Sequence, residues 1–184
     1  MDATAPGPST TVLVVDMLVG FCKHGNLFSP RYEPLIPRLY AHRERAEAQG
    51  SALVFLADAH TPDDPEFRMF PPHCVVGSGE EDVVPELAGF ARRGTLVRKR
   101  TFSGFWRTGL DDVLGRLAPA RVEVTGVCTD ICVLHTVSGL MLRGYEVAVR
   151  GDLVDTYDAP GHDAEEVNRF ALGHIRDVLG ATVE

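Results

Sequence analysis

The sequence lacks the features that would assign it to several common protein classes. No apolar run approaches the roughly 20 residues of a membrane-spanning helix, and no basic segment followed by an apolar stretch marks a secretory signal. The formal net charge is −8, which disfavours a nucleic-acid surface of clustered Lys and Arg. No Gly-x-Gly-x-x-Gly motif follows the first predicted strand, so a dinucleotide-binding fold has no support. We therefore expect a cytoplasmic protein without nucleic-acid or membrane partners.

Cysteine and lysine are both scarce. The four cysteines are Cys22, Cys74, Cys128 and Cys132. They are too few and too scattered for a disulfide framework, and a reduced cysteine that stands out is more often catalytic or metal-binding. Among 18 basic residues only Lys23 and Lys99 are lysines. Lys99 lies between two arginines, and an ammonium has a pKa that its surroundings can tune, whereas a guanidinium does not.

The chain alternates between strand patterns and helix patterns. Short apolar, β-branched runs predict strands at residues 11–16, 51–58, 95–98, 121–126, 145–149 and 181–183. Amphipathic spacing predicts helices at residues 34–49, 110–117, 130–142 and 164–179, the third capped by Thr129 or Asp130. Residues 59–82 are predicted to be a long ordered loop. This order predicts one α/β domain over residues 11–184, after a disordered lead-in at 1–10. We expect a three-layer α/β/α architecture with a mostly parallel, Rossmann-like sheet of about six strands.

Reactive side chains follow the predicted strands. Asp16 and Lys99 lie at strand ends, and Cys132 falls in the first turn of a helix, where the helix dipole favours a thiolate. Ligands of parallel sheets bind beyond the carboxyl ends of the strands. Asp16 can accept the thiol proton, and Lys99 can keep Asp16 ionised and offset developing negative charge. The residues alone leave a structural alternative open, in which the cysteines pack as small apolar groups and Asp16 caps a loop.

A second group follows the predicted strand at 51–58. Asp58, His60, Glu66 and His73 lie in one loop, and a mixed carboxylate–imidazole set suits Zn, Fe, Mn or Ni. Hydrogen bonds that brace the loop are the alternative at this point.

Several sequence blocks occur in the order in which one family carries them. They are Val-Val-Asp16-Met-Leu-Val-Gly-Phe21, Asp58-Ala-His60, Glu66-Phe-Arg-Met-Phe-Pro-Pro-His73-Cys, Lys99-Arg-Thr-Phe-Ser-Gly-Phe105, Gly126-Val-Cys-Thr-Asp-Ile-Cys132-Val and Phe170-Ala-Leu-Gly-His174. With these blocks the chain resembles the isochorismatase-like cysteine hydrolases, and within them the nicotinamidases (pyrazinamidases).

The resemblance implies an assignment for each group. Asp16, Lys99 and Cys132 would form the catalytic triad. A non-proline cis peptide would fall at Val127–Cys128, and the backbone amides of Cys128 and Cys132 would hold the oxyanion. Asp58, His60 and His73, with Glu66 as an additional ligand in some members, would bind one divalent transition metal. Zinc is the first expectation, and Fe, Mn and Ni are alternatives.

The resemblance also implies a substrate. The metal would bind the pyridine nitrogen of nicotinamide, and Phe21, Phe70 and Phe105 would line the pocket, with Trp106 left open as an alternative to Phe105. Several relatives carry Trp at the position of Phe70. The implied reaction is hydrolysis of nicotinamide to nicotinate and ammonia through a cysteine thioester, a step of NAD salvage. The oligomeric state stays open, a homo-oligomer included.

Three other hypotheses compete with this one. The same fold serves amidases that act on ureido or carbamoyl amides, and a catalytically silent relative would serve as a partner-binding subunit. A phosphoacceptor receiver module also places acids at strand ends and a lysine on a later strand, as Asp16, Asp58 and Lys99 do. Receivers, however, have an acidic pair after the first strand, and here Val15 and Met17 flank Asp16.

Overall fold

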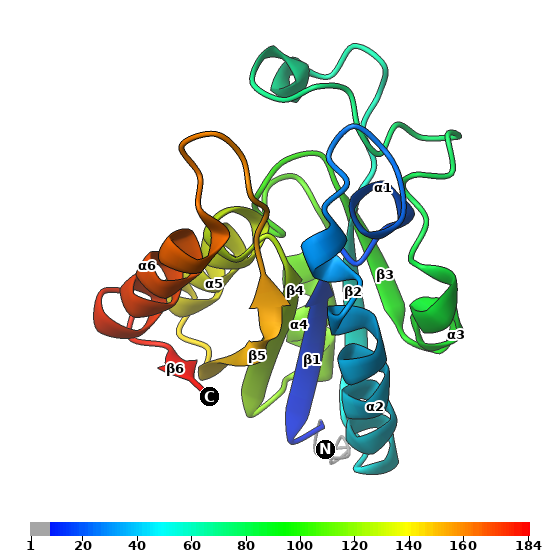
Figure 1. Cartoon of the computed structure of the whole chain (residues 1–184). Helices are drawn as coiled ribbons and strands as arrows, with labels where there is room; N and C mark the ends of the chain where they lie inside the picture. The colour runs from blue at the N-terminus through cyan, green and yellow to red at the C-terminus, as the bar shows by residue number, and fades with distance from the viewer. Residues whose placement is uncertain (1–7) are drawn as a thin grey trace.

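One six-stranded sheet forms the centre of the molecule (Figure 1). A computed structural model describes residues 8–184, so most of the lead-in predicted at residues 1–10 lies outside the described residues. The strand order is β3-β2-β1-β4-β5-β6, and every neighbouring pair is parallel. The strands are β1 (Thr10–Val15), β2 (Ala52–Asp58), β3 (Thr95–Lys99), β4 (Arg121–Val127), β5 (Val147–Asp155) and β6 (Thr182–Val183). The predicted parallel sheet of about six strands is confirmed.

Helices cover both faces of the sheet. They are α1 (Val19–Cys22), α2 (Leu35–Ala48), α3 (Pro85–Arg93), α4 (Leu110–Leu117), α5 (Leu134–Leu142) and α6 (Ala164–Asp177). Val12 and Val14 of β1 belong to a core shared with α2 and α3, whereas Leu13 and Val15 belong to a core shared with α4, α5 and α6. A strand covered on both faces is apolar throughout, which explains the unbroken hydrophobic run of β1. The three-layer architecture is therefore confirmed.

Two short helices were not predicted, and strand β5 differs from its predicted bounds by more than one residue. Helix α1 has only four residues, and α3 contains Gly89 near its centre, so neither gives a sustained helical periodicity. Pro85 at the first position of α3 is a start signal that the sequence reading missed. Strand β5 continues past the predicted end at residue 149 to Asp155, with a register irregularity opposite β4. Among residues 8–184, no helix combines the length and the hydrophobicity needed to cross a bilayer.

The turn after β4 also differs from the prediction. The segment predicted as one helix from residue 130 begins as a π-helical turn, η3 (Thr129–Val133), and continues as α5. Its N-cap is Cys128, and no side chain caps it, so the capping role predicted for Thr129 or Asp130 is wrong. The Asp130 carboxylate instead accepts one hydrogen bond from the Thr156 hydroxyl and faces His162.

A close approach between β1 and β4 sets the position of the functional edge. A Cβ atom on Gly126 would lie 2.0 Å from the carbonyl oxygen of Val15, and the φ of Gly126 is +107°. Only glycine fits there. The strand order also reverses between β1 and β4, and such switch points are the usual ligand sites of parallel sheets. Asp16 and the turn after Val127 therefore meet at that point.

Candidate active site and metal centre

The structure brings Asp16, Lys99 and Cys132 together at the carboxyl edge of the sheet. Asp16 directly follows β1, Lys99 ends β3, and Cys132 lies in η3. The Lys99 Nζ is 2.7 Å from the Asp16 Oδ2, 2.6 Å from the Asp58 Oδ1 and 3.5 Å from the Cys132 Sγ. All four side chains are buried, and the backbone N–H of Asp58 donates to the Asp16 Oδ1 at 3.1 Å. One ammonium therefore touches two carboxylates and one thiol.

Burial and the two carboxylates together set the protonation of this group. Burial, reinforced by the nearby charge of Asp58, raises the pKa of Asp16 to about 6. Burial also raises the pKa of the Cys132 thiol well above its usual range. Burial disfavours the charged form of Lys99, but the negative charges of Asp16 and Asp58 outweigh burial and raise the pKa of the ammonium. The resting state at neutral pH is therefore an ammonium, a neutral thiol and a carboxylate that can accept a proton near neutrality.

The turn that carries Cys132 has the backbone that the resemblance implied. The peptide bond Val127–Cys128 is cis, and the Cys128 carbonyl accepts hydrogen bonds from the N–H groups of Ile131 and Val133. Cys132 thus lies in the π-helical turn between β4 and α5.

A compact set of side chains that could hold a metal ion lies beside the Asp16–Lys99–Cys132 group. One ligand atom from each of Asp58, His60, Glu66 and His73 can be chosen so that all lie within 4.8 Å of one another, and the four residues are buried. The His73 Nε2 is 3.8 Å from the Asp58 Oδ2 and 3.7 Å from the Glu66 Oε1. These separations exceed hydrogen-bond lengths, as expected for ligands that surround an ion. The loop predicted at residues 59–82, which includes the turn η2 (Pro65–Arg68), therefore brings His60, Glu66 and His73 to Asp58 at the end of β2.

The polar atoms of this set fit a bound cation. The Nε2 of His60 is buried and has no hydrogen-bond partner among residues 8–184, an arrangement that a bound metal would relieve. The Nδ1 of His73 lies 2.9 Å from the Pro71 carbonyl, so it donates there and leaves Nε2 free as a ligand. Burial and the charge of Asp58 raise the pKa of Glu66 to about 7. The donors are two imidazoles and two carboxylates, which suit one divalent transition metal.

Asp64 supports the metal-ligand set from outside, and the sequence reading did not find it. Its Oδ2 lies 3.3 Å from the His60 Nδ1, and the Arg100 Nε donates to the same oxygen at 2.8 Å. Carboxylates that orient a ligating imidazole are common behind metal ligands. The sequence signal for this role was an acidic residue four positions after His60. Asp64 also caps η2.

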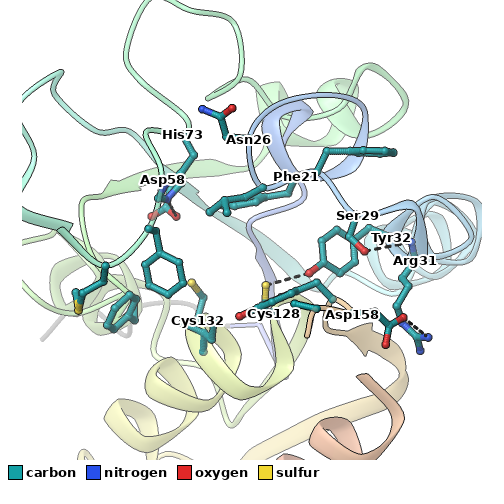
Figure 2. A pocket seen from close by; sticks show the side chains of 18 of the residues that line it. Phe21, Asn26, Ser29, Arg31, Tyr32, Asp58, His73, Cys128, Cys132 and Asp158 are labelled. Carbon is teal, nitrogen blue, oxygen red and sulfur yellow. Dashed lines mark hydrogen bonds and ion pairs between the residues drawn. The ribbon is translucent and has the colours of Figure 1, made fainter. Parts of the chain in front are cut away.

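A cavity of about 620 Å³ is lined by Cys132 and by three of the four candidate metal ligands, Asp58, Glu66 and His73. Figure 2 shows Asp58 and His73 on one side of Cys132, and Tyr32 with Cys128 on the other. Phe21 and Phe70 line the cavity, and the ring centroid of Phe21 is 5.6 Å from that of His73. The far wall includes Tyr32, Tyr157, Arg31 and Asp158, none of which the sequence patterns indicated.

The placement of Phe105 in the pocket is wrong. Phe105 packs in the core shared with α4, α5 and α6, against Gly139, and the Arg143 guanidinium lies 3.9 Å from its ring centroid. Trp106 is 53% exposed and also lies outside the cavity. Phe102 of the same segment lines the cavity instead, with its ring centroid 6.0 Å from that of Phe70. The segment has no regular secondary structure, so its sequence could not predict which aromatic side chain faces the cavity.

Comparison with known sequences gives a family match over nearly the whole chain. Residues 10–178 match the family model described as the isochorismatase domain. Nicotinamidase 1 of Arabidopsis thaliana is 29% identical over 195 residues, which cover 93% of this chain and 79% of the relative.

Solved structures agree with this match. Pyrazinamidase/nicotinamidase from Streptococcus mutans superposes with a TM-score of 0.86 at 29% identity, covering 96% of this chain and all (100%) of that one. Pyrazinamidase of Pyrococcus horikoshii in complex with zinc gives a TM-score of 0.83 at 26% identity, over 96% and 99% of the two chains. N-carbamoylsarcosine amidase from Thermoplasma acidophilum gives 0.81 at 30% identity, over 96% and 95%.

Proposed function

The chain belongs to the isochorismatase family of hydrolases, and from this premise we propose that it hydrolyses nicotinamide to nicotinate and ammonia. The proposal rests chiefly on the buried set of two imidazoles and two carboxylates, three of which line the same cavity as Cys132. Asp58 contacts Lys99 and belongs to the metal-ligand set, so the two groups are adjacent. The reaction supplies nicotinate for NAD salvage.

The metal-ligand set and the aromatic wall account for binding of the ring. Asp58, His60, Glu66 and His73 would hold a divalent metal, which when bound would supply a Lewis acid for the pyridine nitrogen. Phe21 and Phe70 offer apolar surface for a flat heteroaromatic ring.

Asp16, Lys99 and Cys132 carry out the acyl transfer. The Asp16 carboxylate accepts the thiol proton while the Cys132 Sγ bonds to the carboxamide carbon. The backbone N–H groups of Cys128 and Cys132 donate to the oxyanion, a contribution of about 3–4 kcal/mol for each donor. Lys99 balances the negative charge. Asp16 then returns the proton to the nitrogen, the C–N bond breaks, and ammonia leaves a thioester on Cys132.

Hydrolysis of the thioester uses the same residues. A water molecule attacks the acyl carbon while Asp16 accepts its proton, and the C–S bond breaks to release nicotinate. The Cys132 thiolate takes the proton from Asp16 and restores the resting state. The Lys99 ammonium lies 3.5 Å from the Cys132 Sγ, and its positive charge stabilises the departing thiolate.

The second candidate is an amidase for a ureido or carbamoyl amide. The cavity extends past Cys132 to the polar side chains of Arg31 and Asp158, which gives room for a less aromatic substrate. The buried metal-ligand set, however, would have no evident role in binding such a substrate. The receiver hypothesis is withdrawn, because the family match runs through residue 178. The intact triad residues also disfavour a silent relative.

Ammonia release from nicotinamide, pyrazinamide and N-carbamoylsarcosine tests the proposal. Activity on the two heteroaromatic amides should fall after chelation and return when Zn²⁺, Mn²⁺ or Fe²⁺ is added back. Preferred turnover of N-carbamoylsarcosine, unaffected by chelation, would support the second candidate and contradict the first.

A further inference from the structure

The loop between β5 and α6 is tied to the turn that carries the nucleophile (orange in Figure 1). The Thr156 hydroxyl donates to the Asp130 Oδ1 at 2.6 Å, and the His162 Nε2 lies 3.1 Å from the Asp130 Oδ2. Thr156 is fully buried, and Asp130 lies in η3 together with Cys132. One carboxylate thus joins both ends of this loop to the turn of Cys132.

Both ring nitrogens of His162 face hydrogen-bond acceptors. The Nδ1 lies 2.8 Å from the Tyr157 carbonyl oxygen, and the Nε2 faces the Asp130 carboxylate. A neutral imidazole has a single N–H, so only the imidazolium can donate to both acceptors. Burial opposes this charge, but Asp130 and the Tyr157 carbonyl outweigh it and raise the pKa of His162 above its usual value.

The imidazole of His162 lies flat against the Tyr157 ring. The ring centroids are 4.1 Å apart and the planes differ by 4°. A tight turn with paired backbone hydrogen bonds between Ala159 and His162 brings the imidazole back over the tyrosine. Tyr157 is half-buried and lines the cavity that contains Cys132. The protonated imidazole therefore holds one wall of this cavity by two hydrogen bonds and a cation–π contact.

We propose that His162 is a positioning residue that, as an imidazolium, fixes Tyr157 against the substrate cavity and so sets the affinity for the aromatic amide. The inference rests on the proposed function, because it takes an aromatic amide as the occupant of the cavity. Asp130 of η3 and Asp158 of the loop are the charged groups that face His162, and Arg31 pairs with Asp158 at 3.3 Å.

The charge requirement gives the pH dependence a definite sign. The contact is complete where His162 is protonated, and it is lost as the pH rises through the raised pKa. The KM for nicotinamide should therefore rise on the alkaline side, whereas kcat should change little because His162 touches no reacting atom.

Steady-state kinetics with four variants test this role. His162→Ala should raise KM about fivefold to tenfold, the scale of one aromatic contact, and leave kcat nearly unchanged. His162→Gln keeps a neutral donor for Asp130, so its KM should be intermediate and should lack the alkaline rise attributed to His162. Tyr157→Ala should raise KM alone, and His162→Ala should add nothing further in that background. His174→Gln, on α6 and away from the cavity, is the matched control.

An NMR titration of the His162 imidazole tests the contact without turnover. His162 in the wild type should titrate above 6.5, and its pKa should fall in Tyr157→Ala and Asp130→Asn. Titration below 6.5, or additive KM effects of His162→Ala and Tyr157→Ala, would overturn the inference. A raised pKa in a protein that does not hydrolyse nicotinamide would support the charged contact and count against the proposed function alone.

Discussion

Two clusters of charged side chains lie near the two ends of the same sheet, and they differ in how their charges balance. At the carboxyl end, Asp16 and Asp58 share the single ammonium of Lys99. Toward the amino end, the Glu123 carboxylate contacts His42 and lies 3.5 Å from Arg43 and 3.8 Å from Arg150. Arg43 is wholly buried, and none of its guanidinium nitrogens forms a hydrogen bond with the described residues.

The balance of charge decides which cluster can do chemistry. At the carboxyl end, burial and the nearby charge of Asp58 raise the pKa of Asp16 to about 6, so proton transfer near neutrality becomes accessible. Toward the amino end, burial lowers the pKa of Arg43 to about 9, and the group stays charged at neutral pH. That cluster has no nucleophile, whereas the other faces a cavity beside Cys132. A perturbed pKa therefore marks a functional site only together with access and a reactive group.

The largest expected effect is loss of the nucleophile. Cys132→Ala should lower kcat on the order of 10⁶-fold, as removal of other catalytic nucleophiles does, while the free energy of unfolding stays close to that of the wild type. Ammonia release and urea unfolding measure the two quantities. Cys22→Ala, which removes a thiol buried in the other core, should do the opposite by lowering stability and keeping activity. Near-normal turnover by Cys132→Ala would remove the distinction between the two clusters.

The amino-end cluster should contribute stability and no catalysis. Glu123→Ala leaves Arg43 buried without a counter-charge, so the free energy of unfolding should fall by about 3–5 kcal/mol with kcat unchanged at temperatures where the protein is folded. Adding Arg43→Met to this variant should recover much of the loss, because it removes the uncompensated charge. A loss of kcat without a loss of stability would make this cluster functional.

Removal of a metal ligand should affect the carboxyl end alone. His73→Ala should lower metal affinity by more than the roughly 10–100-fold that loss of an outer-shell partner costs, and it should raise KM for nicotinamide. Elemental analysis after dialysis gives the metal content. The exposed His24 provides the control, since His24→Ala should keep both the metal and KM. Unchanged metal content in His73→Ala would refute the metal centre.

The smallest expected effect belongs to the second thiol of the cavity. Only the backbone of Cys128 has a proposed catalytic role, and its Sγ lies 3.1 Å from the Tyr32 hydroxyl. Cys128→Ser keeps a hydrogen-bonding group at this position. The activation free energy should therefore change by at most about 1 kcal/mol, which corresponds to a roughly fivefold change in kcat. A collapse of kcat comparable with that of Cys132→Ala would reassign the nucleophile.

The fold could be predicted because its helices and strands have regular hydrophobic patterns. Part of the site could also be predicted, because all the strands of a parallel sheet end at the same edge. The helix at 110–117 occurs as predicted, and the strands predicted at 11–16 and 51–58 lie within one residue of those bounds. Helix α3 was missed because its periodicity is short and interrupted. Phe105 was misplaced because the side-chain directions of an irregular segment follow from long-range packing, here against Gly139 of α5.

The sequence by itself determined the parallel sheet and the candidate site residues at its carboxyl edge, because the residues that follow parallel strands all lie at the same edge of the sheet. Lys99, Asp16 and the turn of Cys132 needed no further information to be expected together. Only the tertiary structure decided that Phe102 rather than Phe105 lines the cavity, that His162 holds Tyr157, and that Glu123 compensates Arg43. These contacts join segments far apart in the chain through side chains whose directions no local periodicity fixes.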